Sequence, residues 1–206
     1  KGALSNDGNF EITGVLNGSE IAHNTAFAMQ GKEQAAATEA SFSLADKDFS
    51  TDMWLKATGE GTVLSHGNGT EKFKIALDRG MHLVLSVGND TFTSSETVPQ
   101  DSWCYLTVSY KRDGNGGLLN ATVADEATAQ TTDLFRDCVT EAYNGAGTLS
   151  VGENLKGAIH ELTLWDVAHD NTEAQRQRQL TKMPSTAHLI GYWKMDEGDG
   201  TLINDY

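Results

Sequence analysis

Short segments rich in valine, threonine, leucine and aromatic residues follow one another along the chain, and glycines separate them. The 206 residues include 21 glycines but only 2 prolines. Segments of this kind, bounded by glycine, asparagine and aspartate, are typical of strands joined by tight turns. This punctuation therefore predicts an all-β protein of roughly a dozen short strands, which suits a two-sheet sandwich.

The clearest strand is expected in the stretch DFSTDMWLKA. Its odd-numbered residues from Phe49 to Leu55 share one face, whereas Asp52, Trp54 and Lys56 share the other. The alternation predicts a half-buried strand with the first face in the core.

Local patterns also predict one hairpin and one helix. The alternating segments KFKIAL and MHLVLSV are separated by the short turn DRG, so they should pair as antiparallel strands. Residues 170–183 are expected to form a short surface helix. Asp170 or Asn171 can cap its first turn, and Pro184 follows its end.

The charge of the chain argues against several classes of partner. Lysine and arginine number 15 and aspartate and glutamate 29, which gives a formal net charge of −14. This acidic excess repels polyanions, so we expect no binding to nucleic acid or to acidic membrane surfaces. The longest apolar runs, such as LVLSV, are far shorter than the roughly 20 residues that cross a bilayer, so no membrane insertion is expected.

The two cysteines leave two alternatives open. Cys104 and Cys138 permit one disulfide and are too few for a four-cysteine zinc site. Two buried thiols without a bridge are an equally good interpretation, because free cysteine is commonly buried.

The order of segments resembles a known family. Between about residues 25 and 206, the series DFSTDMWLKA, GTVLSHGNG, KFKIALDRGMHLVLSVG, VPQDSWCYLTVSYKR, LSVGENLKGAIHELTLWD and LIGYWKMDEGDGTLINDY is similar to laminin-G-like domains of the concanavalin A-like lectin/glucanase superfamily. The resemblance implies a jelly roll of two curved antiparallel sheets, with residues 1–206 forming a single domain cut from a larger protein. It also implies that ligands bind on the concave face or at the loops of one edge.

Catalysis is not expected. Hydrolases of this family carry the pattern Glu-x-Asp-x-x-Glu on one strand, and no segment here has that spacing. Glu161 and Asp166 are expected on opposite faces of their strand, as are His160 and Glu161, with His160 a solvated surface residue. No Gly-x-Ser-x-Gly elbow occurs, and the six histidines lack the spacing of a zinc site.

Ligand-binding candidates come from the needs of sugar recognition. A pyranose is bound by an exposed aromatic ring that stacks on its apolar face and by amides or carboxylates that contact its hydroxyls. The candidates are Trp54, on the outer face of its strand, and His66, Asn68, Asn89 and Asp90 in predicted loops. The alternative is that Trp54 packs beneath a loop and that the asparagines only form turns.

The acidic stretch DEGDG near the end of the chain also has two interpretations. Its glycines form a turn that brings Asp196, Glu197 and Asp199 together. Calcium takes about six to eight oxygen ligands, so Asp196 and Asp199 could hold a structural Ca²⁺ ion with a carbonyl near Gly31. An exposed acidic turn is the other interpretation, because acidic clusters arise readily in a chain of net charge −14.

These observations favour a non-catalytic binding module of a secreted or cell-surface protein that recognises a glycan. The expected partner is a glycan or a cell-surface protein, and the expected location is extracellular, at the cell surface or periplasmic. The alternative is a structural or adhesive spacer domain that makes protein–protein contacts. A glycoside hydrolase is a third hypothesis, which would require two carboxylates facing each other in a groove.

Overall fold

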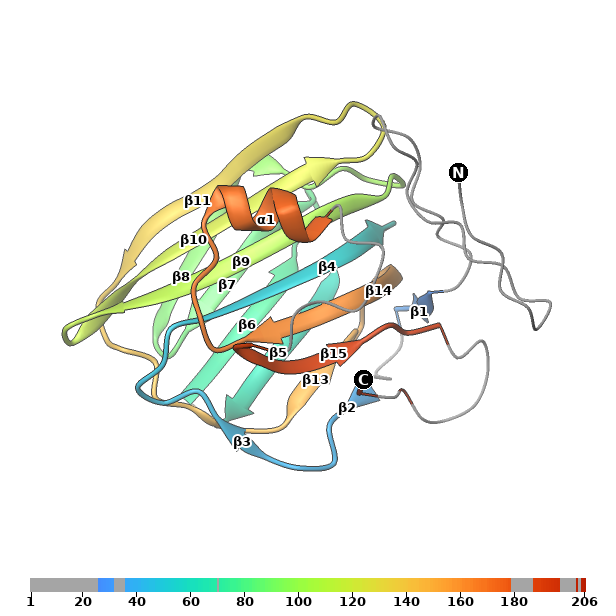
Figure 1. The fold of residues 1–206 in the computed structure, drawn as a ribbon. Helices are drawn as coiled ribbons and strands as arrows, with labels where there is room; N and C mark the ends of the chain where they lie inside the picture. Colours follow the sequence, from blue (N-terminus) through green and yellow to red (C-terminus); the bar gives the residue numbers. More distant parts are fainter. Residues whose placement is uncertain (1–25, 32–35, 70, 179–186, 197–202, 204) are drawn as a thin grey trace.

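In the computed structural model, the chain forms two antiparallel sheets packed face to face, as the jelly-roll prediction requires (Figure 1). The structure describes residues 26–31, 36–69, 71–178, 187–196, 203 and 205–206. The front sheet contains, in spatial order, β1 (Phe27–Gln30), β14 (Lys156–Trp165), β4 (Phe49–Ala57), β9 (Cys104–Asp113), β10 (Gly116–Asp125) and β11 (Thr131–Val139), and β15 (Leu189–Trp193) also pairs with β14. The back sheet contains β2 (Ala36–Ala37), β13 (Leu149–Val151), β5 (Gly61–Asn68), β6 (Glu71–Leu77), β7 (His82–Val87) and β8 (Asp90–Thr97), while β3 (Phe42–Ser43) pairs with β12 (Ala146–Gly147).

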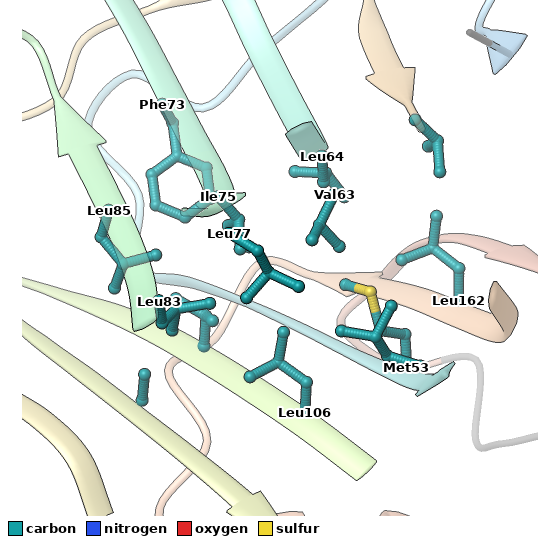
Figure 2. Close-up of a cluster of buried hydrophobic side chains, with 14 of the residues drawn as sticks. Met53, Val63, Leu64, Phe73, Ile75, Leu77, Leu83, Leu85, Leu106 and Leu162 are labelled. Carbon is teal, nitrogen blue, oxygen red and sulfur yellow. The ribbon is translucent and has the colours of Figure 1, made fainter. Parts of the chain in front are cut away.

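The hydrophobic core lies between the inner faces of the two sheets. Figure 2 shows Met53, Leu106 and Leu162 of the front sheet facing Ile75 and Leu77 of the back sheet. Each of these side chains is at most 3% exposed. Since burying one large aliphatic side chain stabilises a fold by roughly 1.5–3 kcal/mol, this layer is the main source of stability.

Strand β4 is buried on both faces, so the prediction of a half-buried strand is wrong. Its inner face packs in the core as predicted, but Asp52 on the outer face is also 0% exposed. The Asp52 carboxylate accepts a hydrogen bond from the Thr107 hydroxyl at 2.7 Å and lies 2.9 Å from Nδ1 of His169. These contacts offset the cost of burying a polar group. His169 leads into helix α1 (Asn171–Arg178), which lies across this face of the front sheet (Figure 1).

A β-bulge in β14 explains a second difference from prediction. The register shifts between His160 and Thr163, and Glu161 has a φ of 53°. The bulge directs His160 and Glu161 to the same outward face, where the Tyr192 hydroxyl donates a hydrogen bond to the Glu161 carboxylate. His160 is only 4% exposed and stacks on Trp54, so the prediction of a solvated His160 is wrong.

The outward face of the back sheet is polar and partly exposed. Ser150, Ser65, Lys74, Ser86 and Thr91 form one row across five neighbouring strands, with each residue directly opposite the next. The Thr91 hydroxyl donates to the Ser86 hydroxyl at 3.2 Å. The two sheets therefore differ, because the front sheet buries part of its outer face and the back sheet presents hydroxyl groups.

The predicted hairpin and helix are present. Strands β6 and β7 pair across the DRG turn. Helix α1 begins after Asp170, whose carboxylate accepts a hydrogen bond from the backbone N–H of Glu173 at 2.9 Å. The predicted continuation to residue 183 falls outside the described residues.

Within the part of the chain that the structure describes, no helix is long and apolar enough to cross a membrane.

Both cysteines are free thiols, so the disulfide alternative is wrong. Cys104 is buried in β9, whereas Cys138 is exposed on β11. Only Cys104 fits the alternative of a buried thiol, and its burial raises the pKa of the thiol well above the ordinary range.

The turn between β10 and β11 provides a stability test. Ala129 is exposed and has a φ of 56°, a left-handed conformation that favours glycine, whereas Ala127 in the same turn is exposed without a positive φ. We expect Ala129→Gly to raise the free energy of unfolding by about 0.5–1 kcal/mol and Ala127→Gly to lower it by a similar amount. Urea denaturation of both variants checks this. Shifts of the midpoint in the same direction would contradict the assignment of strain to Ala129.

Candidate ligand-binding site

A cleft of about 260 Å³ opens at the end of the sandwich where β9 leads into β10. Three segments that are distant in sequence form it: the β7–β8 turn, the end of β9 with the turn that follows it, and residues 140–145 after β11. Its lining residues are Gly88, Asn89, Arg112, Asn115, Glu141, Ala142, Tyr143 and Asn144. The cleft thus depends on the packing that brings these loops together.

Arg112 holds two sides of the cleft in place. Its backbone N–H donates to Asp48 at 2.8 Å, which fixes the end of β9 beside the start of β4. The guanidinium donates to the Asn144 side-chain oxygen at 2.9 Å and forms an ion pair with Asp46 at 3.1 Å. The Asn144 amide in turn donates to the carbonyl of Ala142 at 3.2 Å. The hydrogen-bonding groups of Arg112 and Asn144 are therefore largely used within the protein.

Asp90 holds the third side. One oxygen of its carboxylate accepts hydrogen bonds from both the backbone N–H of Thr140, at 2.7 Å, and the Thr140 hydroxyl, at 2.8 Å. The next residues are fixed by the backbone N–H of Ala142, which donates to the carbonyl of Asn115 at 2.6 Å. These contacts tie the loop after β11 to the β7–β8 and β9–β10 turns.

A cluster of aromatic rings supports the floor of the cleft. Phe49 stacks on Tyr110 with ring centroids 5.0 Å apart and meets Phe73 and Tyr143 edge to face at 4.9 and 5.8 Å. The Tyr110 hydroxyl also accepts a hydrogen bond from the backbone N–H of Tyr143 at 3.0 Å. Gly145 is required here, because a Cβ atom at that position would overlap the Tyr143 ring. The cluster joins the front sheet, the back sheet and the loop in one packed unit.

His66 lies beneath the same loop. Its Nδ1 is 2.9 Å from the Tyr143 hydroxyl and its Nε2 is 3.2 Å from the carbonyl of Phe42, while the Tyr143 hydroxyl donates to the His66 carbonyl at 2.9 Å. A neutral imidazole and a phenol supply only two protons for these three contacts. A protonated imidazole would supply the third, but burial lowers the pKa of His66 below its ordinary value, against the opposing effect of the Phe42 and Gly147 carbonyls.

Three lining side chains do not take part in the contacts that hold the loops together. Asn89, Asn115 and Glu141 are exposed, and the described part of the chain offers none of their side chains a hydrogen bond or ion pair. They present two amides and one carboxylate to the cleft. A polar ligand could bind these groups without displacing any contact that holds the loops.

The five predicted ligand residues do not form one site in the structure. Asn89 lines the cleft and Asp90 holds its wall. Asn68 is exposed at the end of β5, where its amide donates to the carbonyl of Ala146 at 3.4 Å. His66 and Trp54 are only 1% and 4% exposed, so the expectations of a loop position for His66 and of an exposed ring for Trp54 are wrong.

Trp54 belongs instead to a second packed cluster on the outer face of the front sheet. Its ring meets Tyr105 edge to face at 5.3 Å and stacks on His160 at 6.2 Å, while Trp103 meets His160 at 5.0 Å. Tyr105 is buried and its pKa is raised, mainly by burial. Burial likewise raises the pKa of the nearby Glu161 carboxyl, although the Tyr192 hydroxyl opposes that shift. Trp54 is therefore packed, as the alternative expected, but against rings of the neighbouring strands β9 and β14 rather than beneath a loop.

Sequence patterns do not single out four of the lining residues, which are Arg112, Asn115, Glu141 and Asn144. The stretches DGNGG and YNGAG signal turns, and asparagine is common in turns. No local signal indicates that these turns meet, because their convergence depends on long-range pairing.

The calcium prediction remains a prediction. Asp196 is exposed after β15, and Asp199 and Glu197 lie outside the described residues. Within the described part of the chain, no group of three or more histidine, cysteine, aspartate or glutamate side chains could hold a metal ion.

Comparisons with known proteins agree with this architecture. A family model described as the concanavalin A-like lectin/glucanases superfamily matches residues 30–175. A proposed carbohydrate-binding protein from Bacteroides ovatus ATCC 8483 superposes with a TM-score of 0.62 at 13% identity, over 91% of this chain and 57% of that protein. The heptameric SAP-like pentraxin of Limulus polyphemus superposes with a TM-score of 0.56 at 12% identity, over 88% of this chain and 91% of that one. Among curated protein sequences, none matches.

The Asp90 contacts can be tested through stability. We expect Asp90→Ala to lower the free energy of unfolding by about 1–2 kcal/mol, because the variant loses two hydrogen bonds to Thr140. Asp90→Asn, which keeps an acceptor oxygen, should cost less. Chemical denaturation provides the measurement, and Asp137→Ala is the control, since Asp137 is an exposed carboxylate on β11. Equal losses in Asp90→Ala and Asp137→Ala would contradict the proposed role of Asp90.

The lowered pKa of His66 predicts loss of stability in acid. Below about pH 6.5 the unfolded chain protonates this imidazole while the folded protein does not, so stability falls until the pH reaches the folded pKa, by at most about 1.4 kcal/mol per pH unit. His66→Gln should flatten this slope between pH 7 and 5, whatever its effect on stability at pH 7. His188→Gln, at a largely exposed imidazole, is the control. Parallel pH profiles for the parent protein and His66→Gln would refute the assignment.

Proposed function

The chain belongs to the concanavalin A-like lectin/glucanase superfamily, and from this we propose that it is a non-catalytic binding module that recognises glycans. The parent protein in this proposal is secreted or exposed at the cell surface or in the periplasm. Support for that location comes from the laminin-G-like and carbohydrate-binding proteins with this fold, which are often extracellular.

The cleft at the end of the sandwich carries the proposal. It combines a fixed framework, in which Arg112 and Asp90 hold the loops, with the lining groups of Asn89, Asn115 and Glu141, which have no side-chain partner among the described residues. Sugars carry many hydroxyls that both donate and accept hydrogen bonds, and amides and carboxylates are suited to bind them. A preformed framework also lowers the entropic cost of binding, because the loops are already ordered.

A non-catalytic role is supported by the sequence. The strand pattern Glu-x-Asp-x-x-Glu, which family hydrolases use to place two carboxylates on one sugar, does not occur. Glu161, the carboxylate on the bulge of β14, accepts a hydrogen bond from the Tyr192 hydroxyl. Hydrolysis therefore has less support than binding.

A spacer or protein-contact role is the second candidate. The row from Ser150 to Thr91 gives the back sheet a polar surface, and none of the five residues in this row is aromatic. Such a surface suits a solvated face or a polar protein contact better than a sugar-stacking platform. This alternative predicts that the cleft binds no glycan.

An array of immobilised plant, host and microbial glycans tests the proposal. We expect binding to at least one glycan class and a loss of at least tenfold in affinity in the double variant Asn89→Ala, Asn115→Ala, because each lost hydrogen bond contributes about 1 kcal/mol. Asn68→Ala serves as the matched control, since Asn68 is an exposed asparagine at the same end of the sandwich that does not line the cleft. Absence of glycan binding, or undiminished binding by the double variant, would overturn the proposal.

A further inference from the structure

The positive charge that lines the cleft is already paired, whereas the negative charge of Glu141 has no partner among the described residues, and this difference restricts the ligands it can take. The Arg112 guanidinium is paired with Asp46 at 3.1 Å and bonded to Asn144 at 2.9 Å, so it offers little free positive charge to a bound anion. The other charged lining residue, Glu141, is negative. An anionic ligand would meet this carboxylate without a free cation among the lining residues that the structure describes, and like charges in one site are repulsive.

The size of the cleft restricts the ligand further. A cavity of about 150 Å³ accommodates benzene, a six-membered ring without substituents. The cleft, at about 260 Å³, has room for one six-membered ring with its substituents. A longer chain would have to continue into solvent from a unit held in the cleft.

The described lining residues also offer no available aromatic surface. Tyr143 is the one aromatic residue among them, and it is only 1% exposed, with its ring packed against Phe49 and its hydroxyl bonded to His66. Affinity must therefore come from hydrogen bonds to Asn89, Asn115 and Glu141 rather than from stacking. Amides that donate and accept, beside an acceptor carboxylate, match the neighbouring hydroxyls of a sugar ring.

We propose that the cleft binds a single uncharged pyranose unit at the end of a glycan chain and discriminates against sugars that carry a carboxylate. This inference rests on the proposed function and narrows its ligand class. Asn89 and Asn115 act as the hydroxyl-binding residues. Glu141 acts as both a hydroxyl acceptor and the group that repels uronic and sialic acids, which is specificity through repulsion.

Calorimetric titration with small probes tests the ligand class. The probes are the methyl pyranosides of glucose, galactose and mannose, the methyl uronosides of the same rings, and the methyl glycoside of N-acetylneuraminic acid, each at low and high salt. At least one neutral methyl pyranoside should bind at least tenfold more tightly than the methyl uronoside of the same sugar ring. Neutral binding should change little with salt, because no net charge is paired on binding.

Variants separate the roles of the lining residues. Asn89→Ala with Asn115→Ala should reduce the affinity for the neutral probe at least tenfold, whereas Asn68→Ala should leave it unchanged. Glu141→Gln keeps an acceptor oxygen but removes the charge, so it should reduce the preference for the neutral sugar over its uronoside severalfold. Retention of the full preference in Glu141→Gln would contradict the role of this carboxylate.

The outcomes distinguish this inference from the proposed function. If no glycan on the array and no probe binds, the proposed function itself fails. If uronosides or the sialoside bind more tightly, with an affinity that salt weakens, glycan recognition stands and the neutral-sugar inference is overturned. If array glycans bind at the cleft but no single pyranoside competes with them, the proposal of one terminal unit is overturned.

Discussion

The packing of Phe49 against Tyr110, Phe73 and Tyr143 is the contact on which the candidate site depends. Phe49 and Tyr110 belong to neighbouring strands of the front sheet, Phe73 to the back sheet, and Tyr143 to the loop after β11. Four buried rings in edge-to-face and stacked contact bury a large apolar area and fix mutual orientation. They hold the loop to the end of the sandwich, and the polar contacts of Arg112 and Asp90 then set the shape of the cleft above them.

The polar groups beneath the cleft and those at its surface differ in their hydrogen bonding. Below the cleft, His66 and the hydroxyls of Tyr110 and Tyr143 are bonded internally, as buried polar groups must be. At the cleft surface, Asn89, Asn115 and Glu141 remain available to a ligand. A rigid support with exposed polar groups at its surface is the arrangement expected of a preorganised binding site. The outer face of the front sheet is different, because its aromatic residues around Trp54 pack on one another and on His160.

Strands with clear alternation of apolar residues could be recognised from the sequence. Segments such as KFKIAL and MHLVLSV alternate because one side faces the core, and they form β6 and β7 as predicted. Strand β8, with the sequence DTFTSSET, is an edge strand rich in serine and threonine, and β11 contains a bulge that breaks its period. Neither shows the alternation that identifies a strand, so neither was predicted.

The candidate site was predictable only in part. Asn89 and Asp90 could be placed at a turn from local composition, but Arg112, Asn115 and Glu141 acquire a common role only where separate turns meet. Trp54 could be assigned to the outer face of its strand, yet whether that face is open depends on β14, His169 and the packing around them. The sequence by itself determined the all-β class, the core face of the main strands and the acidic character that disfavours polyanions, because these follow from local periodicity and composition. The tertiary structure alone decided which faces are covered and which loops converge, because both depend on contacts between residues that are far apart in the chain.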